Sequence, residues 1–260
     1  MSRPFEPRRL WLLIRGDLLA DYRTFLTTAA AVTGVMLLGS MYTIVQVGAI
    51  DIYYIVWYAG FLSVWMPFVA STSFRDLHDK AKNEAYLLLP ASALEKVAAR
   101  LLRATIGQFA LLLILLTVAS AAIEGINSLV FGQHNTMFDP LALWVWRPLP
   151  WALVGISLFF LGAAWFRKNH FFKTALALTV LPAPFVVFTV IVVRLLLGDL
   201  LESASISMPE GNFYAYYVQH RGMFRFLGSM CEALYFVVLP VFCWSVAWLR
   251  VTEAQVSDGV

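Results

Sequence analysis

Residues 73–103 read SFRDLHDKAKNEAYLLLPASALEKVAARLLR and form a charged island between two long apolar stretches of the chain. Outside the first 23 residues, no other stretch is as rich in Lys and Arg. Loops with an excess of Lys and Arg stay on the cytoplasmic side of a membrane. The island therefore predicts a large cytoplasmic loop between two transmembrane helices.

The composition of the whole chain supports this interpretation. Hydrophobic residues make up 60% of the 260 residues, and charged residues make up 13%. Soluble domains are under about half apolar and roughly a quarter charged. The chain is therefore predicted to be an integral membrane protein. Its first 23 residues lack an unbroken apolar core with a small-residue cleavage site, so no cleaved signal peptide is expected.

Six stretches have the roughly 20 mostly apolar residues that a transmembrane helix needs. The predicted spans cover residues 24–48, 51–72, 104–126, 150–166, 174–198 and 227–249. They predict an all-α transmembrane domain over residues 24–249, followed by a tail at 250–260. The fourth span has an apolar flank, so its start is left open as far back as Leu141. Pro182 and Pro184 are expected to kink the fifth span.

The orientation follows from the distribution of the 19 Lys and Arg residues. Most of them lie on one predicted side, in residues 1–23, in the loop 73–103, in the loop 167–173 and at Arg250. The connections on the opposite side hold Arg147, Arg221 and Arg225, and Arg194 lies within a span. By the positive-inside rule, both termini are predicted to be cytoplasmic.

Residues 1–23 carry a helical pattern of their own. Leu10, Ile14 and Leu18 recur at helical spacing, while charged residues such as Arg8 and Arg15 occupy other faces. The pattern favours an amphipathic helix lying on the cytoplasmic leaflet. The alternative is an ordinary lead-in that only orients the first span.

Within the charged island, the sequence predicts a helix, a break and a second helix. Pro90 biases the preceding residue away from helical angles. Ser92, with Glu95 three residues later, fits a capping box that starts a new helix. The apolar residues 86–89 before the break either form a contact surface for another protein or pack back against the bundle. The sequence favours neither alternative over the other.

The island resembles the cytoplasmic loop of the permease subunits of bacterial type II ATP-binding-cassette (ABC-2-like) exporters. The resemblance covers about thirty residues and rests on a Phe-x-x-Leu start at Phe74 and a Leu-Leu-Pro-Ala-Ser-x-x-Glu-Lys core that ends at Lys96. The six-span plan and the N-terminal helix agree with it. In that family the loop forms a coupling helix that sits in a groove of a separate ATPase subunit. The resemblance therefore implies a multi-pass protein of a bacterial inner membrane.

The resemblance also implies which residues would couple the chain to the ATPase. They are Phe74, Arg75, Leu77, His78, Lys80, Leu87, Leu88, Leu89, Pro90, Ser92, Glu95 and Lys96. The sequence has no GxxxxGK[ST] phosphate-binding loop, so ATP and Mg are expected in the partner ATPase and no cofactor is expected in this chain. Because six spans are few for an export path, the resemblance implies a second permease copy, in a homodimer or a heterodimer.

Three charged residues, Glu124, Arg194 and Glu232, are predicted near the extracytoplasmic ends of spans. One interpretation is solvation at the membrane edge, where snorkelling lowers the cost of a charge. The sharper hypothesis pairs Arg194 with Glu232 to close the outer mouth of a transport path. The aromatic-rich segment 199–226 is expected to face outward as the counterpart of the family's re-entrant helices, so no nucleic-acid partner is expected.

Three classes of function compete. The leading hypothesis is the permease subunit of an exporter for a hydrophobic or amphipathic cargo such as a peptide, a lipid-like molecule or a drug. An intramembrane enzyme needs a nucleophile and base or a metal site, and the predicted spans contain no His, no paired acidic motif and no metal motif. No catalytic or metal-binding residue is therefore predicted. A membrane scaffold that recruits a cytoplasmic partner through loop 73–103, without transport, stays open.

Overall fold

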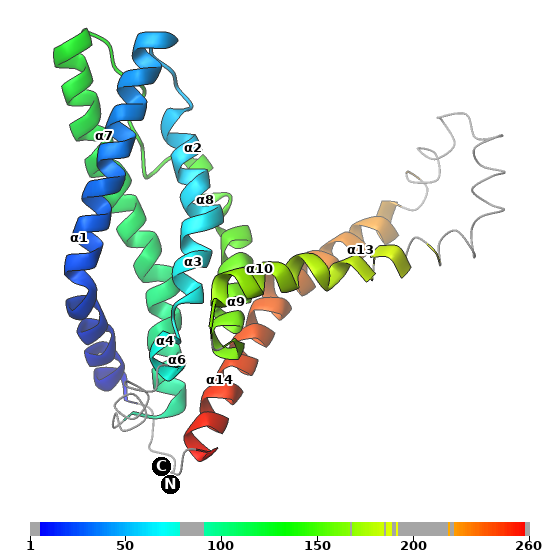
Figure 1. The fold of residues 1–260 in the computed structure, drawn as a ribbon. Helices are drawn as coiled ribbons and strands as arrows, with labels where there is room; N and C mark the ends of the chain where they lie inside the picture. Colours follow the sequence, from blue (N-terminus) through cyan, green and yellow to red (C-terminus); the bar gives the residue numbers. More distant parts are fainter. Residues whose placement is uncertain are drawn as a thin grey trace.

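The computed structural model describes residues 6–78, 91–166, 168–184, 186–188, 191, 218 and 221–257, and within these ranges the regular secondary structure is helical. The helices are arranged as an elongated bundle (Figure 1). Six of them are long and apolar enough to cross a membrane: Tyr22–Gln46, Tyr53–Ser71, Ala93–Phe131, Leu143–Trp165, His170–Phe188 and Gly228–Glu253. The predicted all-α fold with six spans is confirmed.

The helix predicted before the first span is present, but it is not a separate element. Helix α1 (Pro7–Gln46) runs without a break through the amphipathic residues and the first span. No proline interrupts it after Pro7, and its charged residues are compatible with a helical backbone. At 1.5 Å per residue, its 40 residues extend about 60 Å, roughly twice the thickness of a bilayer core. The N-terminal part therefore continues the axis of the first span.

The second span is built from three consecutive helical segments, α2 (Tyr53–Gly60), the π-helical turn η1 (Phe61–Trp65) and α3 (Met66–Ser71). Pro67 lacks an amide hydrogen and its ring crowds the carbonyl four residues earlier, which lies in η1. The wider π turn absorbs this conflict without ending the helix. A short helix, α4 (Arg75–His78), follows α3.

The third span is longer than the sequence predicted. Helix α6 (Ala93–Leu102), the π-helical turn η2 (Arg103–Gly107) and α7 (Gln108–Phe131) form one apolar helix that begins inside the charged island. Its start confirms the capping box, because Ser92 Oγ accepts from the amide of Glu95 and the Glu95 carboxylate accepts from the amide of Ser92. The last third of the island, residues 93–103, therefore belongs to the third span.

Helix α8 (Leu143–Trp146) and helix α9 (Leu149–Trp165) form the fourth span, so the early start left open by the sequence is confirmed. Helix α9 is central to the core, with Phe160 fully buried. A Cβ atom at Gly162 would lie 1.9 Å from Thr174 Oγ1, so glycine at this position allows α9 to approach the next helix closely.

The fifth span and the first part of the sixth diverge from the bundle. Helix α10 (His170–Val180) and helix α13 (Arg221–Ala233) project away from it, whereas α14 (Leu239–Ser257) packs along α9 (Figure 1). The π-helical turn η3 (Leu234–Val238) joins α13 to α14 and precedes Pro240 as η1 precedes Pro67. Helix α10 ends two residues before Pro182, as the predicted kink requires. The start of α1 and the end of α14 lie at the same end of the bundle.

Candidate functional site

The predicted coupling residues fall into buried, exposed and undescribed groups. The side chains of Phe74 and Leu77 are buried, and the Phe74 ring contacts that of Phe160 with 4.8 Å between centroids. These two side chains thus attach the segment after α3 to the core and do not face a soluble partner. Arg75, between them, is exposed.

The rest of the predicted coupling set is only partly visible. Lys80 and residues 87–90 lie outside the described residues, and His78 is described as the last residue of α4. Ser92 is half-buried, whereas Glu95 and Lys96 are buried at the start of α6. The structure therefore brings Ser92 and Glu95 together, with Glu95 buried and Ser92 partly exposed.

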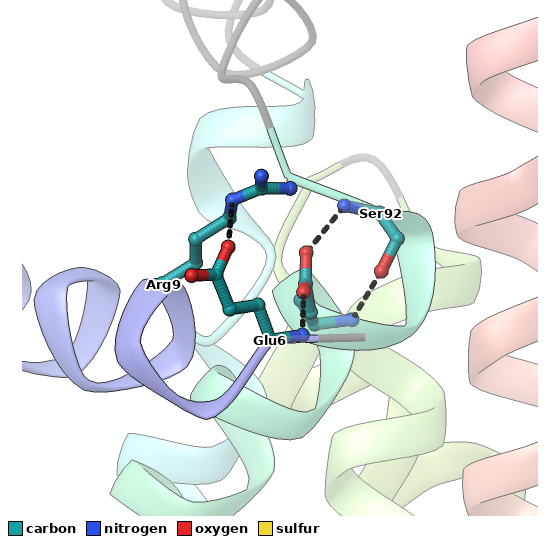
Figure 2. Close-up of polar contacts among 4 residues, drawn as sticks. Glu6, Arg9 and Ser92 are labelled. Carbon is teal, nitrogen blue, oxygen red and sulfur yellow. Dashed lines mark hydrogen bonds and ion pairs between the residues drawn. The ribbon is translucent and has the colours of Figure 1, made fainter. Parts of the chain in front are cut away.

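Glu95 joins two segments that are far apart in the sequence, in a contact that we name the Glu95 clamp (Glu6, Ser92 and Glu95). Its Oε2 accepts from the Ser92 amide and its Oε1 accepts from the Glu6 amide, both at 2.7 Å. The Glu95 amide in turn donates to Ser92 Oγ at 3.2 Å. Figure 2 shows these contacts, with Arg9 paired to the Glu6 carboxylate at 2.8 Å.

The geometry of the Glu95 clamp extends an ordinary capping box. A capping box satisfies two free amides at the start of one helix. Here the second carboxylate oxygen also holds the amide at the N-cap of α1, where the helix would otherwise present a free donor. The starts of α1 and α6 are thus joined by one charged acceptor, and charge-assisted bonds of this kind are about twice as strong as neutral ones.

A second buried carboxylate lies at the opposite end of the same helix, in the Glu124 clamp (Ser40, Tyr54, Glu124, Asn127 and Asn135). Glu124 is inaccessible to solvent and accepts from Ser40 Oγ at 3.0 Å, Tyr54 Oη at 2.5 Å and Asn127 Nδ2 at 3.0 Å. The Asn135 amide and Nδ2 donate to it at 2.8 and 3.4 Å. Five donors suit an ionised carboxylate, which can only accept.

The Glu124 clamp ties four parts of the fold together. Ser40 belongs to α1, Tyr54 to α2, Glu124 and Asn127 to α7, and Asn135 to the segment between α7 and α8. Asn135 also accepts from the amide of Ile50 at 2.9 Å, so it closes the turn between α1 and α2 as well. One end of the bundle is therefore held by a connected and largely satisfied polar network.

The structure corrects one interpretation of the charged residues near span ends. Solvation at the membrane edge is wrong for Glu124, because the side chain is fully buried and bonded within the protein. Glu232 is exposed on α13. Arg194 and most of the segment 199–226 lie outside the described residues, so the Arg194–Glu232 pair stays a prediction. Residues 221–226 form the start of α13.

Sequence reasoning predicted Ser92 as a partner of Glu95, but it missed Glu6 and the partners of Glu124. Asn127 is one helical turn after Glu124, a spacing at which side chains meet, so this neighbour could have been found. Ser40, Tyr54 and Asn135 carry no such local signal. In the described part of the chain, no group of three or more His, Cys, Asp and Glu residues could hold a metal ion.

Comparisons with protein-family models, with curated proteins and with solved structures found no match for this chain.

Proposed function

We propose that this chain is the membrane-spanning subunit of an ATP-driven exporter and that a separate ATPase subunit binds it through loop 73–103. The proposal is supported by six apolar helices, by the basic charge of the loop and by the loop's resemblance to the ABC-2-like coupling segment. A second permease copy would complete the transport path. The cargo class that suits apolar spans is a hydrophobic or amphipathic molecule.

The observation that supports coupling most directly is the Glu95 clamp. A coupling element is useful only if its movement reaches membrane helices. The second half of the loop starts α6, which continues through η2 into α7, and Glu95 also holds the start of α1. A force on this loop therefore reaches two long helices at once.

The first half of the loop supports the same division of roles. Phe74 and Leu77 are buried in the core, where the Phe74 ring contacts Phe160 of α9, whereas Arg75 between them is exposed. An exposed cation between two buried anchors is well placed for electrostatic contact with an acidic partner surface. We therefore assign Arg75 to partner recognition, and Phe74 and Leu77 to transmission of movement.

The test is an Arg75→Glu variant with Lys168→Glu as its control, because Lys168 is an exposed cation on the same predicted side. The complex is isolated from native membranes, and ATPase turnover and transport into inverted vesicles are measured. Arg75→Glu is expected to lower transport at least about tenfold, since a reversed interface charge costs several kcal/mol, whereas Lys168→Glu transports normally.

Two results would count against the proposal. Normal transport by Arg75→Glu would remove the recognition role of the loop. Isolation of the intact chain with a soluble partner that hydrolyses no ATP would favour the membrane scaffold instead.

A further inference from the structure

An apolar groove lies between the two clamps, on the side of the bundle where α1, η1 and α7 meet. It is lined by Phe25, Thr28, Ala29, Val32, Phe61, Trp65, Gln108, Leu111, Leu112 and Leu115. Most of these side chains are half-buried, so the groove is open along one side. Thr28 and Gln108 are its polar side chains.

The groove lies between the two points at which α1 is joined to the third span. α1 and the continuous helix of α6, η2 and α7 are joined by Glu95 at one end and by Glu124 at the other. Between these points their facing positions include small residues, such as Thr28 and Ala29 on α1. Because both ends are joined, sliding or rotation of α1 against α7 would strain one of these carboxylate contacts.

The chemistry of the groove selects a hydrocarbon occupant. A trapped water needs two to four polar partners, and Thr28 and Gln108 are two side chains among ten. Phe25 and Val32 lie about 5 and 15 Å from the start of the Tyr22–Gln46 span at 1.5 Å per residue, which is within one half of a bilayer core about 30 Å thick. The groove therefore opens at the depth of lipid acyl chains.

Arg23 supplies a positive charge at the level of the membrane where the headgroup of such a lipid would lie. Arg23 is exposed at the edge of the span, and its Nε donates to Tyr22 Oη at 2.9 Å. Its guanidinium lies 5.7 Å from the centroid of the Tyr22 ring. Tyr22 is three residues before Phe25, hence on the same face of α1 as the groove. The pair is placed to attract a phosphate, because basic residues at this level attract anionic lipids.

We propose that one acyl chain of an anionic phospholipid occupies this groove, with its phosphate near Arg23. The lipid fills the space between α1 and α7 that lies between the two clamps. It comes from the leaflet at the end of the bundle that carries the start of α1.

The test counts phospholipids that stay on the purified full chain in native mass spectrometry, with phosphatidylglycerol or phosphatidylcholine added. Val32→Phe fills the groove, and Val35→Phe adds the same bulk at an exposed position of the same helix. Val32→Phe is expected to weaken retention of one phosphatidylglycerol at least about tenfold, while Val35→Phe retains it. Arg23→Gln is expected to weaken retention of phosphatidylglycerol and to leave retention of phosphatidylcholine unchanged.

A smaller pair of changes, Ala29→Leu against Ala30→Leu, answers the same question if Val32→Phe does not fold, because Ala29 lines the groove and Ala30 is exposed. Equal retention by the members of both pairs would overturn the proposal, since the lipid would then be a general annular one. If Val32→Phe or Ala29→Leu abolished binding of a second protein copy without changing the bound lipid, the proposal would also be overturned, since the groove would then be a contact between chains.

Discussion

The two carboxylate clamps lie about 44 Å apart on one helix, at 1.5 Å per residue, yet they hold their surroundings in different ways. Glu95 accepts from backbone amides at the starts of two helices. Glu124 accepts mainly from side chains that come from three helices and a connecting segment. Backbone donors tie helix ends locally, whereas the side-chain donors of Glu124 depend on the packing of the whole end of the bundle.

This difference suggests a division of roles under the proposed function. The Glu95 clamp lies beside the predicted coupling loop, where a partner would act, and it joins α1 to α6 through a single hydrogen bond to Glu6. The Glu124 clamp holds α1, α2 and α7 through several bonds. We therefore expect the end with Glu95 to move and the end with Glu124 to stay together as a unit.

The largest expected effect is that of Glu124→Ala. This change leaves five buried donors without their acceptor. At roughly 0.6 kcal/mol for an average membrane hydrogen bond, the expected loss of stability is on the order of 3 kcal/mol. Thermal unfolding in detergent measures this loss. Glu232→Ala is the matched control, because Glu232 is exposed on α13 and its removal is expected to be nearly neutral. Equal effects of the two changes would show that the Glu124 clamp does not hold the fold.

A smaller effect is expected from Glu95→Ala, about 2 kcal/mol, because it removes one helix cap and one charge-assisted bond to a neighbouring helix. Hydrogen exchange should rise at residues 6–10 and 91–96 and stay unchanged at the Glu124 clamp. An increase at both ends would contradict the independence of the two clamps.

The contrast also explains what the sequence could predict. The capping box at Ser92 and Glu95 was predictable because both residues and both amides lie within one helical turn. The bond from Glu6 to Glu95 was not, because it joins segments 89 residues apart and depends on how α1 packs against α6. Glu124 was noticed as a charge near a span end, but its donors Ser40 and Tyr54 are ordinary polar residues of other apolar spans.

The boundaries of the spans also show that local features can be predicted from the sequence and that packing cannot. For residues 1–23 the sequence favours an amphipathic surface helix over an ordinary lead-in, yet α1 is continuous through the first span because charge does not interrupt a helical backbone. The breaks that were predicted correctly involve proline, as at Pro182, where a backbone donor is missing. The effect of a proline on the backbone is local and can be predicted from the sequence, whereas the burial of a carboxylate depends on partners elsewhere in the chain.

The smallest expected effect separates the two functions of Glu95. Ser92→Ala removes the side-chain half of the capping box and leaves the bond from the Glu6 amide to Glu95 Oε1, so a loss of about 1 kcal/mol is expected. The double variant Ser92→Ala/Glu95→Ala should lose less stability than the sum of the two single-variant losses, because both changes remove the same cap. The loss that Glu95→Ala causes in the Ser92→Ala background then measures mainly the tie between α1 and α6. If that loss vanishes, Glu95 is a local cap alone, and the loop has no route to α1 through this residue.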